Sequence, residues 1–109
     1  MISTTTQWIE GTSVDRYCGI VSAEVILGAH AGRDMVANWR DFWGGRASGY
    51  EKVMADARRT AIKRMEAEAV ERGANAVVGV SLTYTVLGET NGMLMACATG
   101  TAVLVARPK

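Results

Sequence analysis

Three sulfur-bearing residues alternate along one apolar stretch near the end of the chain. Met93, Met95 and Cys97 are separated by single residues, so in a β-strand all three side chains would point to the same side. Thioether and thiolate sulfur favour soft metals such as Cu(I), and Cys18 could be a fourth ligand if its strand lies alongside. Methionine and free cysteine are also ordinary core residues, which is the preferred interpretation of the four.

The chain offers little else for metal binding or catalysis. It has no Cys-x-x-Cys pair and a single histidine, His30, so no structural zinc site can be identified. His30 follows the end of a predicted strand, but the spacing places no nucleophile beside it and no pair of carboxylates is visible. We therefore expect no enzymatic activity and interpret His30 as a surface or capping residue.

Glu24 is the only charged residue between Tyr17 and His30. It sits in the middle of an apolar predicted strand, and burying an unpaired carboxylate there would be costly. Glu24 should therefore face water, a pocket or a partner such as an arginine. An exposed edge position or an intersubunit salt bridge is the preferred interpretation, and a ligand-binding carboxylate is the alternative.

Arg46 lies in the loop GGRASGYE, residues 44–51, directly before a predicted helix. Backbone N–H groups at a helix start together with an arginine form a ready anion site. The Lys-Ser/Thr ending of a P-loop is missing. The preferred interpretation is a tight loop in which Arg46 binds carbonyls or a neighbouring acid, and anion binding is the alternative.

Six segments must position these residues. The second helix has the clearest signals: Ser48 and Glu51 fit a capping box, Glu68 and Arg72 are spaced for a favourable pair, and Gly73 is a typical stop. Its predicted apolar stripe comprises Tyr50, Val53 or Met54, Ala57, Ala61, Met65 and Ala69. The predicted strands are 2–6, 14–27, 76–87 and 93–106, and the predicted helices are 32–42 and 48–72.

The last two strands form a predicted hairpin. With the turn at residues 88–92, the numbers of paired residues sum to 180, so one face sets large residues of the first strand against small residues of the second. That face forms a shallow trough that could seat the long helix. The large residues are Val78, Val80, Leu82, Tyr84 and Val86, and their partners are Ala102, Gly100, Ala98, Ala96 and Leu94.

The hairpin is almost free of charge on both faces. Between Ala74 and Ala106 the only charged residue is Glu89, in the predicted turn. A solvated sheet face normally carries charged residues, and one helix covers one face only. We therefore expect the second face, semi-polar and β-branched, to meet another copy of the chain or to line a cavity.

Composition indicates one domain spanning residues 1–109. The net charge is +1 and 49% of residues are hydrophobic, so no broad field favours nucleic acid or an acidic membrane. No apolar run reaches the roughly 18 residues that a membrane helix needs, and the N-terminus shows no secretory signal. We expect a cytoplasmic protein, with Cys18 and Cys97 as thiols.

Five stretches together resemble the YbjQ-like family of small bacterial proteins. They are IVSAEVILGA, the Arg33-Asp34 pair, GGRASGYEKV, ERGANAVVGVSL and ATGTAVLV. The resemblance implies a subunit of a β-sheet and a long helix that assembles into a ring, a homopentamer. The family carries a heavy-metal-binding label without another assigned function. Cys18 and Cys97 match no family metal signature, and Ala23 replaces the usual glycine while Glu24 is kept.

These observations predict an α+β domain with two helices packed on one face of a mainly antiparallel sheet, its subunits assembled into a ring. If the strands 14–27 and 76–87 were neighbours, they would be parallel. The predicted function is a homo-oligomeric binding or scaffold protein whose ligand site lies at subunit junctions. The ligand-binding candidates are Glu24 and Arg46; the alternative is a soft heavy-metal binder that uses Met93, Met95, Cys97 and Cys18.

Overall fold

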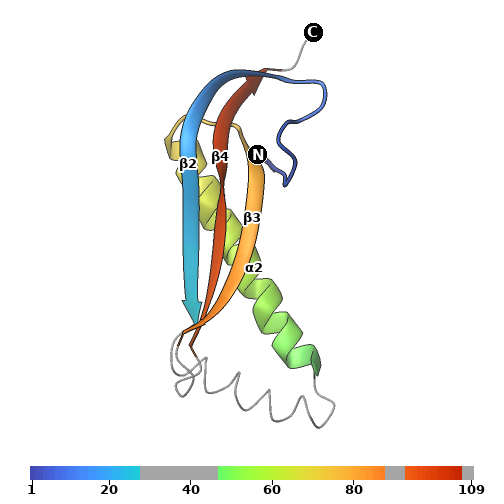
Figure 1. Ribbon diagram of the computed structural model, residues 1–109, viewed down its shortest axis with the longest axis vertical. Coiled ribbons are helices and arrows are strands. Elements are labelled where there is room, and N and C mark those ends of the chain that lie inside the picture. The colour runs from blue at the N-terminus through green and yellow to red at the C-terminus, as the bar shows by residue number, and fades with distance from the viewer. Residues whose placement is uncertain (28–46, 88–92, 107–109) are drawn as a thin grey trace.

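The computed structural model describes residues 1–27, 47–87 and 93–106, which form one sheet and one long helix (Figure 1). The residues of the predicted helix 32–42, together with His30 and Arg46, lie outside the described part. The described part therefore contains one of the two predicted helices. That helix runs along one face of the sheet (Figure 1). The elements are β1 (Ile2–Ser3), β2 (Ser13–Leu27), α2 (Ala47–Glu71), β3 (Ala76–Leu87) and β4 (Met93–Ala106).

The sheet is mainly antiparallel, as predicted. Its strand order is β1-β3-β4-β2, with β4 antiparallel to both of its long neighbours and β1 parallel to β3. Because β4 lies between β2 and β3, these two strands are not neighbours and the parallel pairing considered for them does not arise. In the described part, the outer edges of the sheet therefore belong to β2 and to the portion of β3 beyond β1.

A β-bulge divides β3 into two registers. From Ser81 to Leu87 the paired numbers sum to 180 as predicted, but Val77 pairs with Ala102 and Val78 with Thr101, one position out of step. Gly79 within the bulge has φ of 62°, a left-handed conformation that glycine adopts without steric cost. The prediction that Val78 faces the helix was therefore wrong, because the extra residue turns Val77 to that face instead.

The helix buries a stripe of mostly small side chains against β2 and β4. Ala57, Ala61, Met65 and Ala69 recur every four residues and are each at most 4% exposed, which confirms the core of the predicted stripe. They pack on Val21, Ala23, Val25, Val77, Ala96, Ala98 and Ala102. Alanines on both surfaces, and Gly100 on β4, let the helix lie close to the sheet.

The end of the helix is fixed by Gly73, as predicted. Gly73 has φ of 83°; its N–H donates to the Val70 carbonyl and the Ala74 N–H to the Ala69 carbonyl, both at 3.0 Å. This is the Schellman arrangement that satisfies the last free carbonyls of a helix. At the other end the helix begins at Ala47, so Ser48 lies in the first turn rather than at the predicted N-cap position.

Candidate functional site

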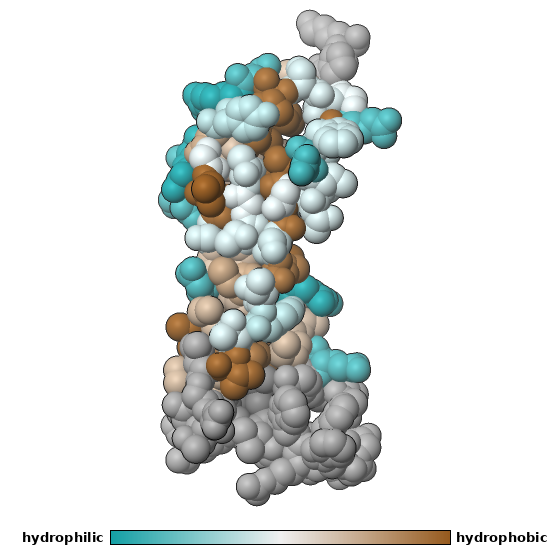
Figure 2. Space-filling view, in the orientation of Figure 1, coloured by the Kyte–Doolittle hydropathy of each residue, from teal (hydrophilic) through white to brown (hydrophobic). Residues whose placement is uncertain are grey.

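The face of the sheet turned away from α2 is the largest uncovered surface of the three long strands. We call it the open face, defined by four rows of residues from β2, β4 and β3 in that order. Figure 2 shows it as mostly pale, weakly polar surface with separate hydrophobic patches. The rows are Ile20–Thr101–Val78, Ser22–Thr99–Ser81, Glu24–Cys97–Thr83 and Ile26–Met95–Thr85.

Only part of the open face is covered by the chain itself. Near the start of β3, Ile9 of the N-terminal segment packs on Ala76, Val78 and Val103. Toward the other end, Ser81, Thr83 and Thr85 are exposed, while Thr99, Cys97 and Met95 are half-buried between their neighbours. The arrangement agrees with the expectation that this face is semi-polar, and within the described part α2 does not cover it.

Glu24 is the only charged residue in the four rows, and it is exposed on the edge strand β2. Its register partner is Cys97, so the carboxylate-bearing residue and the thiol-bearing residue are direct cross-strand neighbours. No described cation forms an ion pair with its carboxylate. An exposed carboxylate with Ser22 on the same face of β2 can accept hydrogen bonds from a polar or cationic ligand. Arg46, the other predicted ligand residue, lies outside the described part.

The structure separates the four sulfur residues into two groups. Met93, Met95 and Cys97 share the open face, because the alternating residues Leu94, Ala96 and Ala98 are buried on the helix side. Cys18 instead packs against the helix-side core.

Cys18 is also displaced along the sheet from the other sulfur atoms. It sits at a bulge beside the pairs Tyr17↔Val103 and Gly19↔Ala102, about five positions from Cys97 along β4, or roughly 17 Å. Cys18 therefore cannot complete a four-sulfur site with Met93, Met95 and Cys97 inside one chain.

The described residues of one chain do not form a complete metal centre. No group of three or more His, Cys, Asp or Glu side chains is clustered among them. The open face offers one thiol, two thioethers and the neighbouring Glu24 carboxylate, whereas a closed structural site generally uses four strong ligands. Sequence reasoning assigned Glu24 and Cys97 to different sites. The structure brings them together because β2 pairs with β4 in a register that the sequence alone does not show.

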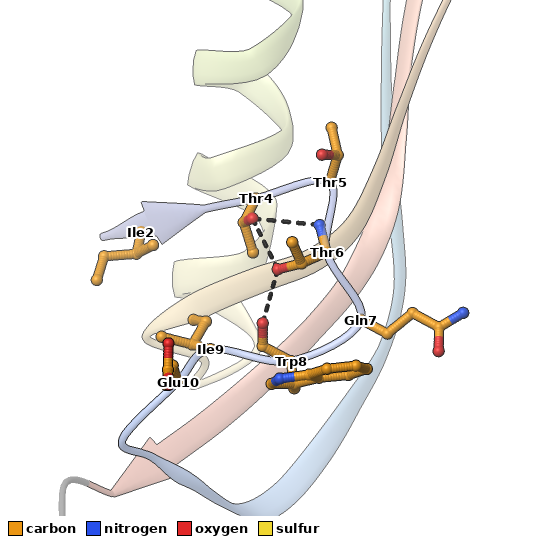
Figure 3. Close-up of a pocket in the computed structure, with 8 residues that line it drawn as sticks. All are labelled: Ile2, Thr4, Thr5, Thr6, Gln7, Trp8, Ile9 and Glu10. Atoms are coloured by element: carbon orange, nitrogen blue, oxygen red, sulfur yellow. Dashed lines mark hydrogen bonds between the residues drawn. The ribbon is translucent and has the colours of Figure 1, made fainter.

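Apart from the open face, the structure has a hollow in the N-terminal segment, for which the sequence predicted only an edge strand (Figure 3). Its volume is about 660 Å³, and its lining residues are Ile2, Thr4, Thr5, Thr6, Gln7, Trp8, Ile9 and Glu10. The Thr6 hydroxyl donates to the Trp8 carbonyl at 2.6 Å, so in the 2.9 Å contact between the two hydroxyls Thr4 is the donor. These hydroxyl protons stabilise the loop itself, while the Trp8 side chain is exposed.

The fold and the open face define a class: small two-layer α+β domains in which one long helix covers one side of a mainly antiparallel sheet. A family described as "Putative heavy-metal-binding", YbjQ_1, matches residues 1–106. The chain therefore belongs to the YbjQ family, as its sequence motifs predicted.

A solved structure supports the fold assignment. The chain is similar to a crystal structure from Pediococcus pentosaceus, a protein of unknown function in the DUF74 family. The two share 16% sequence identity with a TM-score of 0.69, and the match covers 97% of this chain and 98% of the other. At this identity the similarity shows the shared fold. Within the described residues, no helix combines the length and apolar character needed to cross a membrane.

Proposed function

We propose that the protein is a ring-forming homo-oligomer, a binding or scaffold protein rather than an enzyme, with a ligand site at the subunit junctions on the open face. The observation that carries the proposal is the large apolar exposure on β2. Ile20 is 75% exposed, Ile26 is 55% exposed and Tyr17 is 71% exposed. Ile20 and Ile26 stand on the open face at its β2 side, where burial against a second copy would remove apolar surface from water.

The shape of the chain supports the same proposal. Its radius of gyration is 17.0 Å and its extents are 55 × 23 × 16 Å, whereas a compact domain of about 100 residues has a radius near 13 Å. A thin two-layer chain exposes more surface for its size than a compact one. Side-by-side packing of several copies would bury the flat side that α2 leaves uncovered.

The proposed ligand site centres on Glu24, with the hydroxyls of Ser22 on the same strand and Thr99 diagonally across on β4, and with Arg46 added on sequence grounds. A carboxylate beside several hydroxyls suits a small polar ligand that carries hydrogen-bond donors. At a junction the second copy would exclude water and strengthen those hydrogen bonds. These rows contain a single carboxylate, so they offer no carboxylate pair for acid–base catalysis, which favours binding.

Native mass spectrometry tests the assembly directly. At micromolar concentration we expect a single species with the mass of several 11.7 kDa chains, five if the family's pentamer applies, together with any tightly held small molecule. A stable 11.7 kDa monomer under these conditions would contradict the proposal.

Soft-metal binding is the second candidate, favoured by Met93, Met95 and Cys97 sharing one face. We expect a Cys97→Ser/Met95→Leu variant to lose Cu(I) uptake, as measured by mass spectrometry after purification with the metal. Cys18→Ser is the matched control, because it removes a thiol from the opposite face and should bind as the natural chain does. Equal uptake by the double variant and the natural chain would exclude this candidate.

A further inference from the structure

The two outer edges of the sheet differ in how their backbone groups are satisfied. An edge strand presents a row of N–H and C=O groups that can pair with another strand, and proteins commonly protect such edges. β2 forms one edge, and β3 forms the other beyond its short pairing with β1.

Three charged side chains of α2 reach over the edge of β2. An Arg72 Nη1–H donates to the Cys18 carbonyl at 3.4 Å, and an Arg64 Nη1–H donates to the Glu24 carbonyl at 3.4 Å. Between them, Glu68 Oε2 accepts the Ser22 N–H at 3.2 Å. The three helix residues are spaced four apart, so they lie in one row on α2. Their strand partners Cys18, Ser22 and Glu24 are all even-numbered, so the row on α2 runs along a single backbone edge of β2.

The covering side chains are also held by one another and by a glycine. Arg72 Nη2 lies 3.0 Å from Glu68 Oε1. A Cβ atom at Gly19 would lie 2.8 Å from Arg72 Nη1, so the missing side chain leaves room for the guanidinium group to reach the edge. Three backbone groups of the β2 edge, at Cys18, Ser22 and Glu24, are therefore hydrogen-bonded to side chains of the same chain.

The edge of β3 is covered only in its first part. The Thr4 carbonyl accepts the Val80 N–H at 3.0 Å, and the Thr6 carbonyl accepts the Gly79 N–H at 2.7 Å. Since the Val80 N–H points outward, alternation in an antiparallel strand points the backbone groups of Leu82, Tyr84 and Val86 outward as well.

Beyond Val80 the β3 edge carries no protection in the described part of the chain. No described residue hydrogen-bonds there, and Tyr84 and Val86 are 39% and 64% exposed. Residues 76–87 also lack the charged residues and proline that commonly guard an edge. Among residues 1–27, 47–87 and 93–106, nothing pairs with the row of backbone donors and acceptors on this part of the edge.

We infer that the β3 edge from Leu82 to Val86 is the surface on which extended backbone of a second copy of this chain pairs, while Arg64, Glu68 and Arg72 withhold the β2 edge from such pairing. The inference rests on the proposed homo-oligomer and names its contact. A second copy is the occupant because the exposed side chains from Thr83 to Val86 beside this edge carry no charge, which suits a like surface better than a charged partner.

A proline at position 84 tests the β3 edge. Tyr84→Pro removes an outward N–H that makes no bond to β4, so the sheet of a single chain should tolerate it. Tyr84→Ala is the matched control, because it shortens the side chain and keeps the N–H. We expect the proline variant to lose the multimer in native mass spectrometry while retaining its far-ultraviolet circular dichroism, and the alanine variant to keep the multimer.

The possible results separate this inference from the proposed function. If the natural chain is a multimer and the folded Tyr84→Pro variant keeps the same mass, the β3 contact is wrong and the homo-oligomer stands. A monomeric natural chain overturns both. If the proline variant unfolds, amide hydrogen exchange of the natural chain is the deciding measurement. Protection of the Leu82, Tyr84 and Val86 amides at least about tenfold above that in the diluted monomer supports pairing. Equal exchange in the multimer and the monomer refutes it.

The closed β2 edge has its own test. Replacing Arg64, Glu68 and Arg72 together by alanine should speed exchange of the Ser22 amide about fivefold, the loss of one modest hydrogen bond. It should also produce species heavier than the natural multimer. The control replaces Asp56, Arg59 and Lys63, likewise two cations and an anion on α2 but not among the side chains that hydrogen-bond to β2 in the described part, and should match the natural chain. An unchanged mass and Ser22 exchange rate in the first variant would overturn the protective role.

Discussion

The two faces of the same three strands carry different kinds of side chain. Toward α2, β2 presents Val21, Ala23 and Val25, all at most 8% exposed. On the open face the intervening residues Ser22 and Glu24 are exposed. One strand thus combines a tightly packed internal surface with a surface left for other molecules, because successive side chains of a strand point in opposite directions.

On the covered face, the size of a side chain decides whether it is tolerated. On the open face, its polarity matters more. On the covered face, Gly100 and the alanines of β4 make room for the helix, so one added methyl group would be felt. On the open face, side chains stand free of α2, and their substitution should change association more than the fold of a chain. Substitutions on the two faces can therefore break or sharpen this contrast.

The largest effect is expected for Met65→Ala at the centre of the covered face. Met65 is fully buried, and truncating such a side chain leaves a cavity that costs about 2–5 kcal/mol in the free energy of unfolding. Chemical denaturation measures the loss. Glu71→Ala, exposed on the same helix, is the control and should change stability little. A loss below about 1 kcal/mol would show that this core is loosely packed.

A smaller loss is expected for Gly100→Ala in β4. The new Cβ would lie 2.5 Å from Val77 Cγ1 and 3.3 Å from the Val78 carbonyl oxygen, so overpacking should cost about 1–3 kcal/mol. The midpoint of chemical denaturation reports it. Combining Gly100→Ala with Val77→Ala should recover part of the loss, because the clashing methyl group is removed. Failure of the second substitution to recover stability would show that backbone contacts dominate.

On the open face, Ile20→Ser with Ile26→Ser should alter the fold of one chain little, within about 0.5 kcal/mol, since both residues are already exposed. The same pair should shift sedimentation from the multimer toward single chains. Arg58→Ser with Arg59→Ser on exposed helix positions is the control and should sediment as the natural chain does. A multimer that survives the isoleucine changes would remove the open face from the subunit contact.

The smallest effect is expected at the Glu68–Arg72 pair on the β2 edge. The two side chains are 35% and 43% exposed, so solvent screening limits their coupling to about 0.3–0.5 kcal/mol. A double-mutant cycle with Glu68→Gln and Arg72→Ala, measured by denaturation at low and high salt, reports it. Coupling above about 1 kcal/mol that persists at high salt would show a pair more deeply desolvated than the structure indicates.

Local patterns predicted much of this fold from the sequence. The bounds of β3 and β4, the stop at Gly73 and the buried stripe through Ala61 and Met65 agree with the structure. Each depends on neighbours within a few residues: alternation, a four-residue repeat or a glycine that adopts positive φ. The same alternation placed Met95 and Cys97 on one face.

Long-range relations could not be predicted in this way. The bulge at Gly79 exchanged the faces of Val77 and Val78, and no local pattern distinguishes a glycine in a bulge from one in a regular strand. The register of β2 on β4, which sets Cys18 about five positions from Cys97 along the sheet, likewise depends on how whole strands associate. A single sequence shows which secondary structure each segment prefers. It does not show which other segment each strand or helix packs against.

The sequence by itself determined the elements, the family and the presence of a nearly uncharged sheet surface, because these follow from local composition and order. Only the tertiary structure decided that Glu24 stands beside Cys97 and that Arg64, Glu68 and Arg72 cover the β2 edge. Those relations join residues distant along the chain, and the register of β2 on β4 and the seating of α2 fix them. Both depend on packing of the whole domain.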